Sequence, residues 1–499
     1  MDERKDMRKT VRLFGHIWQG DCLSLVMISP GFISLSTDLL DALGAVAGTE
    51  NVISDPAGVE TLSKDYYWYS PVLRDRLESR KAAAAVKVSS LDVLRDVVSL
   101  AAKAGVPITP RGAATGNYGQ CIPLYGGLVI DLSGMDGIVS IEDGVVTAEP
   151  GARLAAIENA ARPKGWELRC YPSTWVKASV GGFISGGSGG IGSIMWGGLR
   201  DQGTIKQIKL LTIEESPRIV VLDEARALEA YHAYGTNGFI VEVQLRLAPA
   251  RRWDQIIVAS RSWADLLDFT QAVADDDSIP KRLVSVLEDP IPSYFKPIKK
   301  FYPADHHLTF LEVDASRTAD VKSRAEAAGL IVPHQIAHHE PRRAPMLSDY
   351  TWNHTTLWAI KADDQFTYLQ SGFTDDFRAQ MSKLHERFPG EILFHLEFVK
   401  GSPRNATMHK AVCGSIPLVR YRSEERLREI IQYCAEIGVG IANPHTCYVD
   451  EAGRSNDFVR QKELKASVDP KGLLNPGKMK THPTNPFIVP GSMPEFLFS

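Results

Sequence analysis

Apolar residues recur along this chain at two alternating spacings. Residues 35–48 and 90–105 carry apolar side chains three and four positions apart, which predicts amphipathic helices. Ser90 or Asp92 is the expected N-cap of the second helix, and Gly105 lies just past its end. A further helix is expected at residues 154–165. Short apolar runs bounded by glycine and proline predict strands at residues 82–90, 106–109, 126–135, 144–152, 204–213, 217–223 and 238–250.

A second unit begins after Pro249 and alternates in the same way. Its expected strands are residues 255–260, 308–316 and 392–401, and its expected helices are residues 262–276, 318–329 and 374–388. This order is typical of an α+β layer with helices on one face of a sheet. We therefore divide the chain into an N-terminal extension (1–34), a first domain (35–249), a second domain (250–440) and a C-terminal segment (441–499) that returns to the first domain.

Composition narrows the class of protein. The chain has 499 residues, 44% of them hydrophobic, and a formal net charge of −4, so it lacks the basic character expected of a nucleic-acid-binding protein. The apolar run from Cys22 to Ile28 is far shorter than the ~20 residues that span a bilayer, and no transmembrane segment is expected. The six cysteines form no C-x-x-C pair, which favours a reducing, cytoplasmic location.

The stretch "VGGFISGGSGGIGS", residues 180–193, is half glycine and contains G-x-G-x-x-G from Gly187 to Gly192. A Rossmann fingerprint follows a buried strand and opens a helix. Here "KASVGGFIS" precedes the motif without a continuous β run, and Gly197 and Gly198 fall where the helix should continue. Since glycine costs about 1 kcal/mol in a helix interior, the Rossmann interpretation is disfavoured.

A different use of glycine is a nest of main-chain N–H groups for a pyrophosphate. A second segment of small residues, 112–116 in "PRGAATGNYGQ", follows the expected strand at residues 106–109. Two such loops from separate strands are suited to hold one long dinucleotide between them. Composition supports equally the alternative that both are tight turns that pack the core.

The chain resembles the FAD-linked oxidoreductases of the vanillyl-alcohol oxidase / p-cresol methylhydroxylase superfamily. Within that superfamily it is most similar to the branch that contains the GlcD flavoprotein of glycolate oxidase and D-lactate dehydrogenase. Four segments carry the resemblance, in order: "VPITPRGAATGNYGQ", "YPSTWVKASVGGFISGGSGG", "YGTNGFIVEVQLRLAP" and "VDPKGLLNPGKM". The resemblance implies a PCMH-type FAD-binding domain of two α+β subdomains, with an α+β cap domain whose sheet is antiparallel.

Carried over by position, the resemblance also implies a set of cofactor-binding residues. Residues 110–116 would form the pyrophosphate loop, residues 172–185 the pyrophosphate and ribityl side, and residues 235–240 the adenosine half. The expected FAD contacts are Pro110, Arg111, Gly112, Ala113, Ala114, Thr115, Gly116, Pro172, Ser179, Gly181, Gly182, Ser185, Gly235, Gly238, Ile240 and Asn475. Some relatives attach FAD covalently through a His of the first loop; because Thr115 stands there, non-covalent FAD is expected.

The chain departs from its branch at the metal site. Neither the H-x-G-D-G-N-x-H element nor the E-H-G element is found, and "EIGVGIANPHTCYVDEAG" offers only His445 where the second should lie. No metal is expected, and a 2-hydroxy-acid substrate is in doubt. The adjacent histidines 306–307 and 338–339 are interpreted as surface residues.

Candidate catalytic groups lie on the expected cap strand and on the C-terminal return. In "EILFHLEFVKG", Ile392, Phe394, Leu396 and Phe398 form one face, and His395 and Glu397 share the other. We expect His395 and Glu397 to contact substrate or act as base, and His445 with Tyr448 to polarise the substrate oxygen. "WNHTTLWAIKADDQFTYLQ" also offers His354, Lys361 and Tyr368. For any one of these histidines a structural role remains the stronger alternative.

Three functions stay open. The first is hydride transfer from an alcohol, 2-hydroxy acid or phenol to FAD, with oxygen, a quinone or a protein subunit as electron acceptor, since the chain has no cysteine cluster for an iron–sulfur centre. The second is non-redox alkyl transfer, for which "RRAPM" and "VRYRSEERLR" are candidate sources of arginine. The third is a flavoprotein subunit that needs a partner. A homodimer is also left open.

Overall fold

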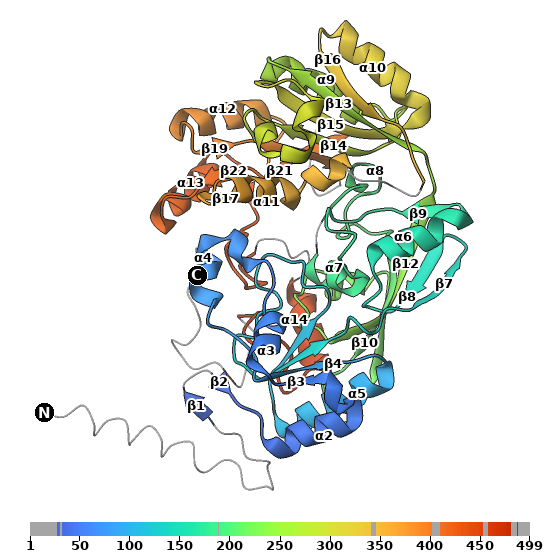
Figure 1. Ribbon diagram of the computed structural model, residues 1–499, viewed down its shortest axis with the longest axis vertical. Helices are drawn as coiled ribbons and strands as arrows, with labels where there is room; N and C mark the ends of the chain where they lie inside the picture. Colours follow the sequence, from blue (N-terminus) through green and yellow to red (C-terminus); the bar gives the residue numbers. More distant parts are fainter. Residues whose placement is uncertain are drawn as a thin grey trace, which may run out of the picture.

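The computed structural model describes residues 27–29, 32–187, 189–340, 346–401, 410–452, 458–480 and 487. Within this part of the chain, the architecture is built on sheets of four, six and eight strands with two smaller sheets beside them. In Figure 1 the first half of the chain forms the lower part of the molecule and the later strands form the upper part. One of the smaller sheets pairs β1 (Met27–Ser29) with β2 (Phe32–Ile33). Most of the predicted apolar run at residues 22–28 lies outside the described residues.

The four-stranded sheet contains the first predicted strands. Its order is β3 (Val52–Ile53), β4 (Ala84–Lys87), β6 (Leu128–Asp131) and β5 (Ile108–Arg111), with β4 and β5 both parallel to β6. The helices of this region are α2 (Thr37–Ala47), α3 (Pro56–Leu62), α4 (Pro71–Leu77) and α5 (Leu91–Ala104). Ser90 caps α5 by accepting from the N–H of Val93, and Gly105 ends it with a left-handed φ of 63°. The predicted helices at 35–48 and 90–105 are thus confirmed.

The six-stranded sheet follows in sequence. Its main path is β11 (Ile219–Asp223), β10 (Ile205–Leu211), β12 (Phe239–Pro249), β8 (Val145–Ala148) and β7 (Ile138–Glu142), and β9 (Trp166–Leu168) pairs with the end of β12. These pairs are antiparallel, and α6 (Leu154–Ala161) packs beside them. The strands expected at 204–213, 217–223 and 238–250 are confirmed.

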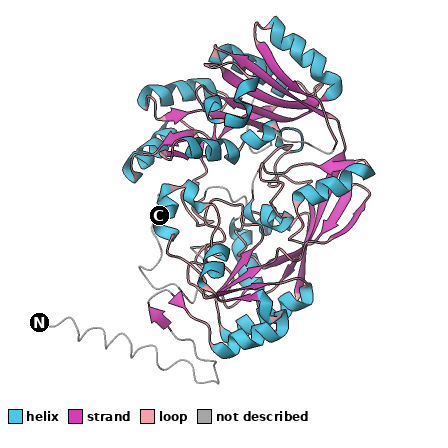
Figure 2. Cartoon of the chain, in the orientation of Figure 1, coloured by secondary structure: helices cyan, strands magenta, loops and turns pink. Residues whose placement is uncertain are grey.

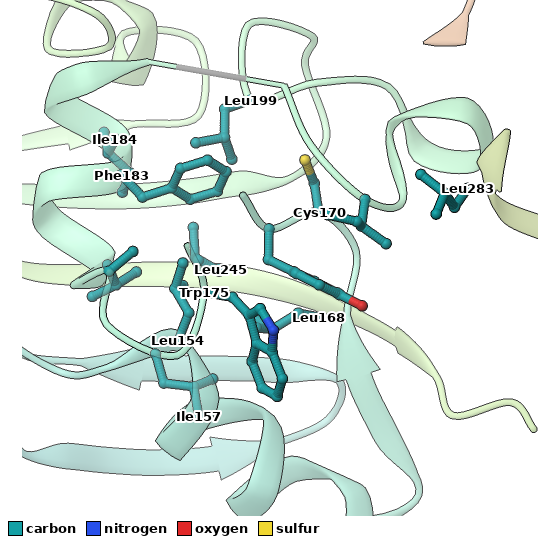
Figure 3. Close-up of a cluster of buried hydrophobic side chains, with 14 of the residues drawn as sticks. Leu154, Ile157, Leu168, Cys170, Trp175, Phe183, Ile184, Leu199, Leu245 and Leu283 are labelled. Carbon is teal, nitrogen blue, oxygen red and sulfur yellow. The ribbon is translucent and has the colours of Figure 1, made fainter. Parts of the chain in front are cut away.

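The glycine-rich stretch is helical, which the sequence did not indicate. Residues 180–186 form α7 (Val180–Gly186), and α8 (Ser193–Trp196) follows after a turn. Val180, Phe183 and Ile184 are buried, and Figure 3 shows Phe183 and Ile184 among the side chains of a larger apolar cluster with Leu154 and Leu245. This packing outweighs the poor helix propensity of three glycines. Because a helix and not a strand precedes Gly187, the exclusion of a Rossmann fingerprint is confirmed.

The eight-stranded sheet forms the core of the second unit and is antiparallel throughout. Its order is β16 (Ile331–Ile336), β13 (Trp253–Ser260), β15 (His307–Asp314), β14 (Lys281–Leu287), β20 (His395–Lys400), β21 (Ala411–Ser415), β18 (Ser371–Gly372) and β23 (Gly440–Ile441). A three-stranded sheet of β17 (Phe366–Tyr368), β22 (Leu418–Arg420) and β19 (Ile392–Leu393) lies beside it. Helices α9 (Trp263–Asp275), α10 (Thr318–Ala327), α11 (Asn353–Ala362), α12 (Phe377–Arg387) and α13 (Glu424–Glu436) surround these sheets (Figure 2).

The predicted alternation in residues 392–398 is confirmed. Ile392, Phe394, Leu396 and Phe398 are buried in one apolar cluster with residues of α9 and α12. His395 and Glu397 lie on the opposite face, where their side chains form a hydrogen bond. One face of β20 therefore packs on helices, and the other carries buried polar groups.

The end of the chain returns to the first sheet. α14 (Phe458–Val468) leads to Leu474, which forms a parallel bridge with Ile108 of β5. The Lys465 ammonium forms an ion pair with Asp469, and Asp469 in turn accepts from the N–H groups of Leu473 and Leu474. This fully buried cluster fixes the return of the tail. Among the described residues, no helix is both long and apolar enough to cross a bilayer.

Candidate functional site

One pocket brings together the glycine-rich segments that are far apart in the sequence. Every predicted cofactor-binding residue except Asn475 lines it: residues 110–116, Pro172, Ser179, Gly181, Gly182, Ser185, Gly235, Gly238 and Ile240. The space between the lining atoms measures about 1340 Å³, including the part open to solvent. The sequence thus located three sides of a single cavity large enough for an extended ligand.

Close backbone approaches hold these segments together. An ideal Cβ on Gly112 would lie 2.5 Å from Ser179 Oγ, so only glycine lets the first loop touch the start of α7. Gly235 has a φ of 66°, and a Cβ there would lie 2.6 Å from the Pro110 ring. These two glycines allow the first and third segments to reach their neighbours.

The third segment is attached to the C-terminal end of α7 by main-chain bonds. The N–H of His232 donates to Ile184 O at 3.0 Å, and the N–H of Tyr234 donates to Ser185 O at 3.0 Å. His232 Nδ1 also donates to Gly186 O at 2.6 Å. The carbonyl groups that end α7 therefore position the loop before β12.

The first loop presents main-chain donors to the pocket. Ala114 has a φ of 49°, and the N–H groups of residues 114–117 make no hydrogen bond to another described residue. Unused N–H groups next to a left-handed residue suit an anion such as a pyrophosphate. Across the pocket, a Cβ added to Gly182 or Gly186 would meet little besides open space, with Ser179 Oγ at 2.9 Å and Gln120 Nε2 at 3.9 Å as the nearest atoms. The residues present thus leave room for a dinucleotide and offer donors to it.

Asn475 lies behind the pocket wall. Its Nδ2 donates to Gln120 O at 2.9 Å and to Tyr234 O at 2.6 Å, and Gln120 and Tyr234 both line the pocket. Asn475 also has a left-handed φ of 44°, and its own N–H donates to Ile108 O. The structure therefore gives Asn475 the role of joining two loops of the wall, whereas the sequence predicted a direct contact with the cofactor.

The remaining wall comes from the second unit. Trp352, Asn353 and His354, at the start of α11, line the pocket together with Tyr69 and Tyr118. His354 was one of several histidines that the sequence offered, and Trp352 and Asn353 were not singled out. The signal available for them was only a run of polar and aromatic residues at the start of a helix.

Burial controls the titration of the groups at this wall. Desolvation lowers the pKa of His354 to about 4, so its imidazole is neutral at pH 7 and able to accept a proton. Behind the first loop, burial raises the pKa of Asp65 to about 6, although the N–H groups of Cys121 and Tyr67 donate to its carboxylate. Arg111 is the cation of the first loop, and its Nη1 donates to the carbonyl groups of Leu62 and Lys64.

The predicted catalytic pair His395 and Glu397 is brought together but lies behind the pocket lining. His395 Nε2 and Glu397 Oε1 are 2.8 Å apart, and both side chains are almost fully buried. Glu397 Oε1 also accepts from the N–H of Trp352 at 2.7 Å. The pair therefore contacts the pocket wall, and neither residue is among those that line the cavity.

His445 and Tyr448 require a correction, because neither lines the pocket. His445 is buried; its Nδ1 accepts from Ser70 Oγ at 2.7 Å, and its Nε2 donates to Tyr368 O at 2.9 Å. Tyr448 is fully buried in the largest apolar cluster, and burial raises the pKa of its phenol. Both side chains serve packing and bracing, because the C-terminal return passes through the interior at this point.

Other candidate residues are also explained by structural contacts. His307 packs on Trp263 and accepts from the N–H of Asp289, and His338 accepts from the N–H of Trp253. No cluster of three metal-ligating side chains occurs in the part of the chain that the structure describes. Arg420 pairs with Asp363, and Arg426 pairs with Glu391. Arg342 and Arg343 of "RRAPM" lie outside the described residues.

Comparison with known proteins gives this pocket a chemical context. Residues 82–213 match the family model of the FAD binding domain. An uncharacterized FAD-linked oxidoreductase of Mycobacterium tuberculosis is 25% identical over 261 residues, 50% of this chain and 52% of that protein, so this match spans about half of each. Glycolate oxidase subunit GlcD of Bacillus subtilis is 22% identical over 481 residues, 89% of this chain and 97% of that protein.

Two further matches extend over most of the chain. D-2-hydroxyglutarate dehydrogenase of Stutzerimonas stutzeri is 22% identical over 477 residues, 88% of this chain and 98% of that protein. A solved structure of alkyldihydroxyacetonephosphate synthase superposes with a TM-score of 0.68 at 14% identity, covering 95% of this chain and 92% of that one. The second match concerns the fold, and it confirms the predicted α+β architecture with a PCMH-type domain and a large antiparallel sheet. The chain is therefore a member of the FAD-linked oxidoreductase family, with an FAD binding domain at residues 82–213 and distant homology to glycolate oxidase GlcD and D-2-hydroxyglutarate dehydrogenase over most of its length.

Proposed function

We propose that this protein holds FAD non-covalently in the pocket and oxidises an alcohol, 2-hydroxy acid or phenol by hydride transfer to it. The observation that carries the proposal is the convergence of three predicted cofactor segments on one cavity whose remaining wall contains a neutral histidine. The distant homology to enzymes whose names specify glycolate and D-2-hydroxyglutarate supports a hydroxyl-bearing substrate.

The chain's own groups divide the pocket between cofactor and substrate. The free N–H groups of residues 114–117 would hold the pyrophosphate, and the open side of Gly182 and Gly186 would accommodate the chain of the cofactor. Gly235, Gly238 and Ile240 would border the adenosine half. The start of α11 then faces the space left for a substrate.

Non-covalent attachment is supported by the absence of a competent nucleophile at the loop. Thr115 has no nitrogen to form a bond to the isoalloxazine. Burial raises the pKa of Cys121 to about 12 and that of Cys170 to about 12, so both thiols stay protonated and unreactive at neutral pH.

When bound, FAD supplies the hydride acceptor of an alcohol oxidation. The protein must position the carbinol carbon and take up the hydroxyl proton. We assign proton uptake to His354, because it is the histidine among the residues that line the pocket and its imidazole is neutral at pH 7. Tyr69 and Trp352 provide apolar surface that excludes water from this end.

Electrons then pass to oxygen, a quinone or a separate protein subunit. The five described cysteines are free, so we propose a reducing, cytoplasmic location and no disulfide-linked partner among the described residues. The arginines of residues 420–426 form ion pairs with Asp363 and Glu391, away from the pocket lining. They therefore give no specific support to the non-redox alkyl transfer that the fold neighbour's name suggests.

The decisive experiment is anaerobic mixing of the purified yellow protein with a panel of alcohols, 2-hydroxy acids and phenols while the flavin absorbance near 450 nm is followed. Loss of that absorbance with one class, at a rate that saturates with concentration, is the expected result. Turnover without any net change in flavin absorbance would favour alkyl transfer. A flavin that no member of the panel reduces would refute the proposal.

A further inference from the structure

The backbone of Trp352 adopts a conformation that its side chain disfavours. Its φ of 52° and ψ of −139° lie close to the first central position of a type II′ turn, which glycine normally occupies. For a bulky aromatic residue, such a conformation persists only where surrounding contacts enforce it. Because Trp352 directly precedes α11, this conformation sets where Asn353 and His354 begin.

Glu397 supplies the enforcing contact. Its Oε1 accepts from the Trp352 N–H at 2.7 Å, across 45 residues of sequence and from a different element. The same oxygen accepts from Ser285 Oγ at 3.1 Å and from His395 Nε2 at 2.8 Å. A carboxylate held by two side chains of the sheet is a rigid acceptor, and a hydrogen bond to a charged group is stronger than one between neutral groups.

His395 has a defined part in this cluster. It is fully buried, its Nε2 lies 2.8 Å from Glu397 Oε1, and its Nδ1 has no hydrogen-bond partner among the described residues. The ring therefore donates through Nε2 and fixes the orientation of the carboxylate. Thr355 of α11 lies 3.4 Å from the same nitrogen, so the cluster also contacts the first turn of the helix.

The position of Trp352 matters on the pocket side as well. An ideal Cβ on Gly189 would lie 2.9 Å from the Trp352 ring, so the indole packs directly on the glycine-rich turn after α7. Trp352, Asn353 and His354 are the residues of this strained start that line the pocket. The buried polar face of β20 thus acts on the pocket through one main-chain N–H group.

We propose that Glu397, oriented by His395, is a positioning residue that holds Trp352 in its left-handed conformation and so places Asn353 and His354 against the substrate. This role rests on the proposed function and replaces the direct catalytic role expected from the sequence. It assigns substrate placement to a carboxylate that does not line the cavity.

The test compares three variants of the full-length protein loaded with FAD. Glu397→Met removes the acceptor at similar size, Glu397→Gln keeps a carbonyl oxygen, and Ser285→Ala removes another donor to the same carboxylate without touching the Trp352 N–H. Hydrogen exchange of the peptide around residue 352 and steady-state kinetics with the best substrate are measured for each.

We expect Glu397→Met to keep its FAD content, to speed exchange at Trp352 at least about tenfold, and to lower kcat by roughly ten- to a hundredfold, since small misplacements of reacting groups are costly. Glu397→Gln should restore kcat to within about threefold of the parent protein, and Ser285→Ala should leave exchange at Trp352 unchanged.

The inference is overturned if Glu397→Met leaves either local exchange or kcat unchanged, or if Ser285→Ala reproduces both effects, since the cluster would then act only as core packing. If no compound reduces the flavin of the parent protein, the proposed function fails. The exchange data still decide in that case whether Glu397 holds Trp352.

Discussion

Two adjacent glycines of α7 should respond in opposite ways to the same added methyl group. A Cβ on Gly182 would lie 2.9 Å from the rotatable Ser179 Oγ and otherwise project into open space of the pocket. A Cβ on Gly181 would lie 2.7 Å from Pro150 Cβ and 3.0 Å from both its Cα and its carbonyl oxygen. The first methyl competes with a ligand, whereas the second collides with backbone.

The magnitudes follow from helix propensity and packing. Replacing glycine by alanine inside a helix gains up to about 1 kcal/mol, so Gly182→Ala should leave the apoprotein as stable as the parent or slightly more stable. Forcing a methyl group into filled space costs about 1–3 kcal/mol. Gly181→Ala should therefore lower the free energy of unfolding by up to about 2 kcal/mol, and Gly182→Ala should weaken FAD binding by roughly 5- to 150-fold.

The assay is denaturant unfolding of the apoproteins, followed by titration of each with FAD while quenching of flavin fluorescence is recorded. Gly182→Ala must separate the two properties by losing affinity without losing stability. Parent-like FAD affinity in Gly182→Ala would refute the placement of the cofactor along the open side of α7. Equal stability of the two apoproteins would refute the steric reasoning.

Three other outcomes are expected. Acid precipitation should release the yellow colour into the supernatant, because Thr115 and the protonated Cys121 cannot hold FAD covalently; colour that stays in the pellet would contradict this. The raised pKa of Asp65, about 6 in the folded protein, means that the folded state binds its proton more tightly than the unfolded chain. Its contribution of roughly 3 kcal/mol is therefore complete below pH 4 and is lost as pH rises through 6, and Asp65→Asn should lack this fall in unfolding free energy, so parallel stability–pH curves would argue against it. His354→Gln should slow anaerobic flavin reduction by about 10²- to 10⁴-fold in stopped-flow, and the parent rate should show no His354 ionisation above about pH 5; a rate within threefold of the parent would remove His354 as the base.

The sequence was most informative where main-chain geometry alone is required. Gly112 and Gly235 mark places where a loop must touch another segment or adopt a positive φ, and such needs are visible in one sequence. The alternation of residues 392–398 was equally readable, because a strand between a helical layer and a polar layer keeps a period of two.

The residues that the sequence did not indicate depend on distant parts of the chain. β14 is buried along its whole length although it begins with Lys281 and Arg282, because Arg282 pairs with Glu312 and Lys281 donates to main-chain carbonyl groups. The pocket wall at Trp352 likewise depends on Glu397, which no local pattern connects to it. His445 was expected at the substrate because histidine is chemically versatile, and only its two buried hydrogen bonds reveal its bracing role.

The bridge formed by Asn475 has a consequence for how the protein is made. Its side chain joins the loop at Gln120 to the loop at Tyr234, and the adjoining Leu474 pairs with β5. A ribosome that has produced the first 440 residues has released every glycine-rich segment of the pocket but not the residue that joins their edges. Cofactor loading therefore belongs to the end of synthesis, and a nascent chain stalled before residue 475 should emerge colourless even where FAD is abundant.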